Sequence, residues 1–135
     1  MGKIKKVKHK SIKSLRKKAW KLKSEYVRRK ADGKCFTCDD KRPWKEQQAG
    51  HYIHKDCLDY DEIGIQCQCV RCNKWLSGNQ GIYAERLIRK YGIKAVEKLR
   101  ERANQSFKKW TVGELELIIE DLQKKLQSIQ EGKNG

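Results

Sequence analysis

The sequence predicts an α+β fold in which a small, metal-stapled core lies between helical segments. Three observations predict it: an amphipathic helical pattern before the first cysteine, two Cys-x-x-Cys pairs that enclose a hairpin pattern, and helical periodicity through the rest of the chain. Only 37% of the 135 residues are hydrophobic, so a large core is not expected, and the fold needs an additional cross-link such as a bound metal ion. We divide the chain into a basic arm and helix (1–34), the core (35–92) and a C-terminal helical region (93–135).

The predicted N-terminal helix begins after Ser11. Its apolar residues recur at steps of three and four and form one stripe: Ile12, Leu15, Ala19, Leu22 and Tyr26. The sequence Ala-Asp-Gly at 31–33 ends this helix, because Gly33 suits a left-handed cap. Lysines and arginines fill the positions between the stripe residues, so the outer faces of the helix are basic.

Positive charge is concentrated in this N-terminal segment. The chain has a net charge of +16, of which residues 1–34 contribute +13, whereas residues 111–135 carry −2. Such a block is typical of an arm that binds a polyanion, and the lack of a wide aromatic and leucine face favours nucleic acid over a membrane surface. A lysine tail that only aids solubility is the alternative. The residues predicted to bind DNA are Lys13, Arg16, Lys17, Lys21, Arg28, Arg29 and Lys74.

The sequence lacks recognisable targeting and membrane signals. No apolar stretch approaches the roughly 20 residues of a membrane span, and the basic N-terminus is not followed by the apolar segment of a secretion signal. We therefore expect a cytoplasmic, nucleoid-associated protein with no membrane partner. Its six cysteines are then reduced and available to a metal ion.

Four of these cysteines predict a structural Zn²⁺ site. They form two tight turns, each of which presents two thiolates to a tetrahedral ion: Cys35 with Cys38, and Cys69 with Cys72. Thirty residues separate the pairs, and a β-hairpin predicted between Ala49 and Gln68 accounts for this long separation. Cys67 is an alternative to Cys69, because the two share a face in an extended strand, although the paired turns favour Cys69.

Helical periodicity returns after the second cysteine pair. Apolar residues predict a helix that ends at Gly92 and a further helix over 93–103. The last helix begins at a capping box formed by Thr111 and Glu114, with Trp110 placed to contact Leu115. Behind the cap runs a heptad seam: Val112, Leu115, Ile119, Leu122, Leu126 and Ile129. This seam either packs on its own domain or pairs with a second subunit.

His51 and Asn73 are the candidate catalytic residues. Asn73 follows the last cysteine of the predicted zinc turn, so we expect its amide oxygen at the N-terminus of a helix, where backbone amides favour phosphate. A histidine on a hairpin strand that faces such an oxygen is the arrangement of the ββα-metal, or HNH, nucleases. His51 would be the base that activates water, and Asn73 would hold Mg²⁺ or Mn²⁺. A structural histidine on a strand is the alternative.

Several separate motifs resemble the phage NinG (Rap) recombination nucleases. They are AGHY at 49–52, QCVRCN at 68–73, SGN at 77–79, LIRKYGIKAVEKL at 87–99 and KWTVGEL at 109–115. The resemblance implies a zinc-stapled ββα-metal (HNH-like) core and a structure-selective endonuclease that cleaves branched double-stranded DNA, such as Holliday junctions and D-loops. It implies His51 as the general base, Asn73 at the catalytic ion, and the two Cys-x-x-Cys pairs around structural zinc.

The second strand departs from the family pattern, and Gly50 departs from the pattern of many HNH enzymes. Where the second strand of the family reads Asn-Ile-His, this chain reads Gly64-Ile65-Gln66, so the asparagine that braces the catalytic loop is missing. Many HNH enzymes also place an aspartate before the catalytic histidine, where this chain has Gly50. The loss of the asparagine leaves a less rigid site, a substitute brace or a weakened enzyme.

Four polar residues are candidates for supporting the site: His54, Asp61, Gln66 and Asn79. Asp61 and Gln66 are the candidates for the substitute brace. His54 lies at an odd offset from His51, which places it on the opposite face of a regular strand. We therefore expect His54 to have a structural or phosphate-facing role.

Three functions are compatible with these features. The leading one is a metal-dependent endonuclease, expected to be a homodimer because symmetric resolution of a junction needs two cuts. A non-catalytic, zinc-stabilised DNA-binding protein on a degenerate HNH scaffold is the alternative that Gly64 favours. An RNA-binding zinc module is disfavoured, because no aromatic-rich sheet motif is present to stack single-stranded bases.

Overall fold

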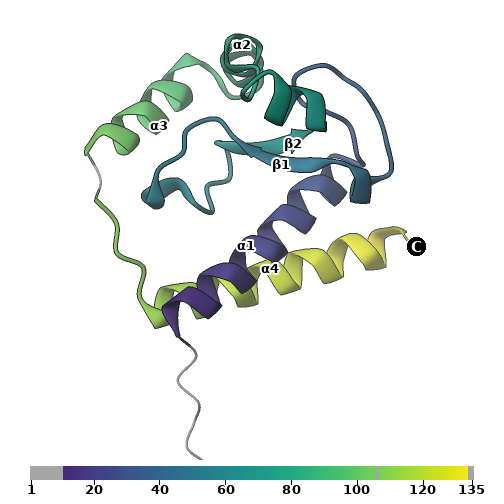
Figure 1. Ribbon diagram of the computed structural model, residues 1–135. Helices are drawn as coiled ribbons and strands as arrows, with labels where there is room; N and C mark the ends of the chain where they lie inside the picture. Colours follow the sequence, from purple (N-terminus) through teal and green to yellow (C-terminus); the bar gives the residue numbers. More distant parts are fainter. Residues whose placement is uncertain (1–10, 106, 134–135) are drawn as a thin grey trace, which may run out of the picture.

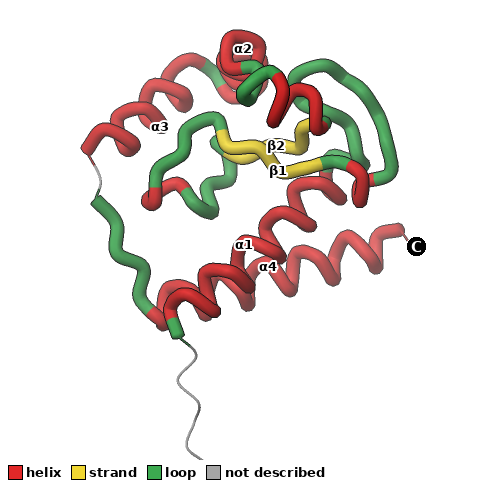
Figure 2. The backbone as a smooth tube through the Cα atoms, viewed as in Figure 1, coloured by secondary structure: helices red, strands yellow, loops and turns green. Residues whose placement is uncertain are grey.

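The computed structural model describes residues 11–105 and 107–133 and has a mixed, mostly helical α+β architecture. Its main elements are α1 (Ile12–Lys30), β1 (Gln48–His51), β2 (Ile65–Gln68), α2 (Gln80–Tyr91), α3 (Ile93–Gln105) and α4 (Val112–Lys133). The short helical turns η1 (Trp44–Glu46), η2 (Asp56–Leu58) and η3 (Arg71–Trp75) connect them. The hairpin lies between α1 and α2, and α4 runs along α1 (Figures 1 and 2). Residues 1–10 of the predicted basic arm lie outside the described residues.

α1 begins and ends where the sequence predicts. The Ser11 hydroxyl accepts a hydrogen bond from the Ser14 N–H at 3.1 Å, which caps the first turn. After Lys30 the chain turns back through Gly33, whose φ is +74°. A Cβ atom at Gly33 would lie 1.7 Å from the carbonyl oxygen of Arg42, so this turn requires glycine.

The predicted seam of α4 packs against α1. Leu15 and Ala19 of α1 form a buried cluster with Leu115 and Ile119 of α4, and Trp110 packs against it. The capping box is present as predicted, because the backbone N–H of residue 114 donates to the threonine hydroxyl of residue 111 at 3.2 Å. The first half of the seam is therefore covered by its own chain, whereas Leu126 and Ile129 are only half-buried. None of the helices within the described ranges has the length and apolar character needed to cross a membrane.

The two faces of the hairpin have different partners. β1 and β2 are antiparallel, with Gln48 opposite Gln68 and His51 opposite Ile65. On one face, Ile65 and Cys67 pack with Val27 of α1. The other face carries mostly polar side chains, contacts η3, and receives a 2.7 Å hydrogen bond from the Tyr83 hydroxyl of α2 to the Gly50 carbonyl. Because side chains alternate along a strand, neighbouring residues of β1 face these two different environments.

No α-helix begins at Asn73, so that prediction is wrong. Asn73 lies in η3, a short π-helical turn, and α2 begins only at Gln80. The chain first wraps around the cysteine cluster: the Cys72 N–H donates to Cys69 Sγ at 3.4 Å, and the Gly78 N–H donates to the Cys72 carbonyl at 2.8 Å. The phosphate-favouring helix end expected at Asn73 is therefore not formed there.

Candidate metal centre and hairpin site

The two Cys-x-x-Cys pairs come together in one cluster. The sulfur atoms of four cysteines lie within 4.8 Å of one another: Cys35, Cys38, Cys69 and Cys72. Tetrahedral zinc with Zn–S bonds of about 2.3 Å places its thiolates about 3.8 Å apart. The Cys38 and Cys69 sulfurs are 3.6 Å apart, close to that separation. The cluster is therefore the set that the sequence predicts, and its geometry can hold a zinc ion.

Polar groups around the cluster are placed to stabilise thiolates. The Asn79 side-chain amide donates to Cys72 Sγ at 3.7 Å, and the Thr37 hydroxyl lies 3.4 Å from Cys35 Sγ. Burial raises the pKa of Cys35, but the hydrogen bonds around its sulfur outweigh burial and lower the pKa to about 7. Asn79, a candidate for support of the catalytic site, thus lies at the cysteine cluster.

Cys67 lies outside the cluster. It is buried against Val27 of α1, and burial raises the pKa of its thiol to about 12. Cys67 and Cys69 do not share a strand face, because β2 ends at Gln68. The remaining cysteine, Cys57, is half-buried, with its sulfur 3.6 Å from the carbonyl oxygen of Arg102.

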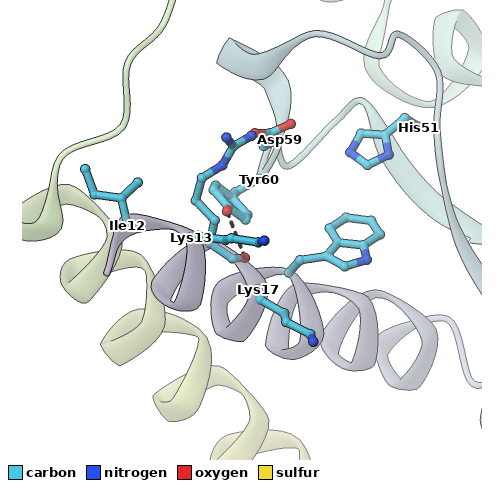
Figure 3. A pocket seen from close by; sticks show the side chains of 8 residues that line it. Ile12, Lys13, Lys17, His51, Asp59 and Tyr60 are labelled. Atoms are coloured by element: carbon cyan, nitrogen blue, oxygen red, sulfur yellow. Dashed lines mark hydrogen bonds and ion pairs between the residues drawn. The ribbon is translucent and has the colours of Figure 1, made fainter. Parts of the chain in front are cut away.

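His51 ends β1 with its ring facing α1 (Figure 3). The imidazole stacks on Trp20 with ring centroids 4.8 Å apart and an interplanar angle of 21°. Its Nε2 atom is buried and has no hydrogen-bond partner in the described part of the chain. Burial lowers the pKa of His51, and the neighbouring His54 lowers it further. The imidazole is therefore neutral at pH 7, with an unused nitrogen.

His54 lies beside His51, so the prediction that it occupies the opposite face is wrong. The two ring centroids are 5.1 Å apart. The alternation rule does not apply because β1 ends at His51 and the chain bends before His54. His54 is exposed and lies close enough to contribute charge to the site.

A pocket of about 490 Å³ connects His51 to the basic face of α1. Lys13, Arg16 and Lys17 line it together with Asp59 (Figure 3). Arg16 is held by a 2.8 Å ion pair with Asp59, whereas Lys13 and Lys17 are exposed and have no ion pair with a carboxylate in the described ranges. Three of the predicted DNA-binding residues therefore gather on the side of His51.

The other predicted DNA-binding residues lie elsewhere. Arg28 and Arg29 cover the ring of Trp44, with guanidinium carbons 5.0 and 4.5 Å from its centroid. Lys21 is exposed on α1, and Lys74 is exposed in η3. The basic residues thus follow α1 and continue at η3 instead of forming one patch around His51.

Asn73 approaches the other face of β1, at Gly50. Its amide nitrogen donates to Gln48 Oε1 at 2.8 Å, and its Oδ1 would lie 2.8 Å from a Cβ atom at Gly50. Gln68 Oε1 would lie 1.8 Å from the same Cβ atom, and it is buried without a hydrogen-bond partner. The Gln68 amide nitrogen donates to Thr37 Oγ1 and the Gly78 carbonyl, which fixes the direction of its oxygen. Two side-chain oxygens therefore converge on Gly50.

His51 and Asn73 do not face each other across one space, as the sequence reasoning expected. Because Gly50 and His51 are consecutive in β1, their side-chain directions point to opposite faces. The imidazole meets α1, and the carboxamide meets the polar face. Both groups nevertheless lie at the same strand, and β1 has a strand neighbour on one side only in the described residues.

Asp61 and Gln66 hold the loop that leads into β2. Asp61 Oδ2 accepts hydrogen bonds from the backbone N–H groups of Ile63 and Gly64 at 2.9 and 2.7 Å. Asp61 Oδ1 pairs with Arg102 at 3.0 Å, and the Asp61 side chain is only 8% exposed. Gln66 Nε2 donates to the Ile63 carbonyl at 3.0 Å. Both candidates for a substitute brace therefore bond to the segment around Gly64.

Replacing Asp61 with alanine is expected to lower the free energy of unfolding by about 2–4 kcal/mol. The change leaves two backbone N–H groups without their acceptor and breaks a partly buried ion pair, and solvent around Arg102 moderates the loss. Urea denaturation measures it. Glu62→Ala is the matched control, because the Glu62 side chain is 78% exposed and should contribute less than about 1 kcal/mol. Equal losses in the two variants would contradict a bracing role for Asp61.

Three residues near the candidate site are not predicted from the sequence as site residues. Trp20 lies beside the predicted apolar stripe and carries the stack with His51, and Gln68 reads as an ordinary strand residue. Trp75 is 80% exposed in η3, two residues after Asn73. The sequence signal for Trp75 is that an aromatic residue directly follows the polar residues Asn73 and Lys74, where a core position is not expected.

Comparison with known proteins gives a consistent family match. A family model described as "Bacteriophage Lambda NinG protein" matches residues 1–132. Proteins named "Protein ninG" from Escherichia phage 933W, Salmonella phage P22 and Escherichia phage lambda are 32%, 31% and 30% identical to the chain over 109 residues. Each match covers 78% of this chain and 52–53% of the relative, so the chain spans about half the length of these relatives. No solved structure matches the chain.

Proposed function

This chain belongs to the bacteriophage NinG family, and we propose that it is a metal-dependent, structure-selective DNA endonuclease that cleaves branched recombination intermediates such as Holliday junctions and D-loops. One observation carries the proposal. A neutral imidazole with an unused Nε2 lies in a lysine-lined pocket, next in the chain to a glycine on which two amide oxygens converge. Base, oxygen ligands and cationic side chains are the groups that phosphodiester hydrolysis requires.

In this proposal His51 takes a proton from the attacking water. Its lowered pKa keeps the ring neutral at pH 7, and Nε2 is the atom free to accept the proton. Trp20 fixes the plane of the ring, so little orientation is lost when the substrate binds. His54 is near enough to contact the same phosphate or to share the proton with solvent.

Asn73 Oδ1 and Gln68 Oε1 are the atoms proposed to hold Mg²⁺ or Mn²⁺ at Gly50. Amide oxygens are hard ligands that suit these cations, so the donor set fits, although it supplies no negative charge. When bound, a divalent ion stabilises charge on the phosphate and on the leaving oxygen. Because both oxygens are neutral, we expect the cation to bind weakly until DNA phosphate completes the site.

Branched DNA is the proposed substrate because basic and aromatic groups flank β1. Lys13 and Lys17 can neutralise phosphates beside His51, and Lys74 can do so beside Asn73. The exposed ring of Trp75 offers a stacking surface for a base at a branch point, where bases are least constrained by the duplex. Lys21, Arg28 and Arg29 extend the contact along α1.

The cysteine cluster is proposed to hold a structural zinc ion. With four thiolates around it, such an ion has no open position for water or substrate. The zinc would fix η3, and therefore Asn73, against the hairpin. Its role is to position the site and not to activate water.

One observation favours a second function, a non-catalytic DNA-binding protein. His51 and Asn73 lie on opposite faces of β1, and the stack on Trp20 is also what a structural histidine would make. A protein of this kind would keep the basic surface and the zinc cluster. It would bind junctions without cutting them.

A junction assay separates the two functions. Purified protein is incubated with an end-labelled four-way junction, with and without Mg²⁺ or Mn²⁺, beside a linear duplex of the same sequence. The endonuclease nicks the junction, spares the duplex and requires the added cation, and Asn73→Ala loses cleavage but keeps binding. Lys124→Ala is the control, because Lys124 is exposed on α4 and pairs with Glu120. Junction that is bound but uncut under every cation would leave the DNA-binding function.

A homodimer remains part of the proposal because symmetric resolution of a junction takes two cuts. Leu115 and Ile119 of the α4 seam pack on α1, so the contact between subunits would use the half-buried end of the seam at Leu126 and Ile129 or another surface. Light scattering with and without junction DNA tests this. A monomer under both conditions would remove the dimer and leave a nicking enzyme.

A further inference from the structure

A second basic pocket lies farther along α1. It has a volume of about 390 Å³ and shares no lining residue with the pocket at His51. Along α1, the residues that line the His51 pocket lie between Ile12 and Trp20, whereas those that line the second pocket lie between Lys23 and Ala31, just after the helix. Taking 1.5 Å per helical residue, the centres of these segments lie about 16 Å apart along the helix. We call the second one the Tyr26 pocket.

The Tyr26 pocket collects positive charge from three helices. Lys23 and Lys30 come from α1, Lys90 from α2 and Lys125 from α4. The ammonium groups of Lys23, Lys30 and Lys125 lie 5.8, 5.6 and 5.5 Å from the centre of the Tyr26 ring, so one aromatic ring has three cations around it. Residues far apart in the sequence thus converge on one concave site.

These charges are only partly compensated by acidic residues in the part of the chain that the structure describes. Glu62 is the acidic residue that lines the pocket, its side chain is 78% exposed, and it pairs with Lys125 at 3.2 Å. Lys125 also pairs with Asp121 at 3.0 Å. Lys23, Lys30 and Lys90 have no ion pair with a carboxylate among the residues that the structure describes. An excess of positive charge therefore faces the cavity.

Lys23 is the most unusual member, because it is only 3% exposed. Holding an ammonium group where little water reaches it and other lysines surround it is costly; here it lies 5.8 Å from the centre of the Tyr26 ring, and the charges of Glu62 and Asp61 offset the cost only in part. Burial lowers the pKa of Lys23, which reflects this cost. A lysine that served only to pack would be replaced at lower cost by methionine or leucine. Its ammonium is better explained by an anion that enters the pocket.

We propose that the Tyr26 pocket binds a phosphate group, with Lys23 and Lys90 as its main cationic contacts. The tetrahedral anion would accept hydrogen bonds from ammonium groups on different helices and would compensate the buried charge of Lys23. Two sources present this chemistry. One is the backbone of a second DNA arm, which rests on the proposed nuclease function, and the other is a free phosphate anion, which does not.

The test uses the full chain in buffer without Mg²⁺ or Mn²⁺, so cleavage does not enter. Inorganic phosphate is titrated by calorimetry into the wild type, Lys23→Met, Lys90→Gln and the control Lys124→Gln. Losing one charge-assisted contact is expected to weaken phosphate binding about tenfold or more in the first two variants and to leave the control unchanged. Lys23→Met should remain folded and melt no lower than the wild type, because it removes a buried cation. Lys90→Gln changes an exposed position, so it still tests the site if Lys23→Met fails to fold.

The same proteins are then titrated with an uncut four-way junction. If junction affinity falls in Lys23→Met and Lys90→Gln but not in Lys124→Gln, the DNA backbone supplies the phosphate. If only the affinity for inorganic phosphate falls, the ligand is a free anion. The proposal is overturned if the wild type binds no phosphate and the variants keep their junction affinity, or if Lys124→Gln weakens binding as much as the others. If the phosphate proposal is overturned in this way but the chain still cuts junctions, the proposed nuclease function stands and only the Tyr26 pocket is excluded as a phosphate site.

Discussion

Replacing His51 with alanine is expected to lower the rate of junction cleavage about 10²–10⁴-fold and to leave junction binding unchanged. The imidazole is the neutral base in the proposed mechanism, and the cationic contacts lie on α1 and η3, so the loss falls on the chemical step. Single-turnover cleavage of the labelled junction gives the rate, and a gel-shift titration gives the affinity. His51→Gln, which keeps most of the ring's volume against Trp20, should be as inactive as the alanine variant.

The pH dependence of cleavage gives a second measure of the same role. Burial lowers the folded-state pKa of His51, and the charge of His54 lowers it further. As the pH rises, the ring therefore loses its proton at a lower pH than an ordinary histidine does. Cleavage should therefore be constant near pH 7 and fall as the pH drops through that lowered value. His54→Ala removes a neighbouring positive charge and should move the fall to higher pH. Full cleavage by His51→Ala would exclude the imidazole as the base and favour a second-metal or substrate-assisted reaction.

Loss of the zinc ligands is expected to have the largest effect on stability. A structural zinc contributes roughly 10–16 kcal/mol of apparent binding free energy in small domains, which is as large as the whole stability of many domains. Cys72→Ser should therefore bind no zinc and lose the cooperative unfolding of the hairpin core. Mass spectrometry under native conditions counts the bound metal, and thermal unfolding followed by circular dichroism reports the fold.

Cys57→Ser is the matched control, because Cys57 is half-buried and lies outside the four-cysteine cluster. It should bind one zinc ion per chain and unfold near the wild-type temperature. A chelator should reproduce the Cys72→Ser result in the wild type, and added zinc should reverse it. A metal-free wild type that unfolds at the same temperature as the zinc-loaded protein would show that the cysteine cluster does not stabilise the fold.

Local sequence signals are sufficient to predict most of the secondary structure. The Ser11 cap, the glycine turn at Gly33 and the Thr111 capping box each depend on contacts within a few residues, and all three are present. The cysteine cluster is also predictable, since the Cys-x-x-Cys turns carry their own geometry.

The arrangement of the catalytic candidates depends on facts that the local sequence does not contain. Whether His51 and His54 share a side depends on where β1 ends, and the face that Asn73 approaches depends on how η3 packs after the cysteine cluster. Gln68 points its oxygen at Gly50 because Thr37 and Gly78 hold its amide nitrogen from two other segments. These outcomes are set by packing between segments, so a pattern of residue types could not predict them.

The packing of α4 on α1 has a consequence for how the molecule is made. α1 carries most of the cationic side chains proposed to bind DNA, yet its apolar stripe is covered by a helix that leaves the ribosome only after the hairpin and the cysteine turns have been synthesised. Contacts so distant along the chain form late, because a long loop must close first. A nascent chain that ends before residue 111 would therefore expose the apolar stripe of α1 beside its lysines until α4 has been synthesised.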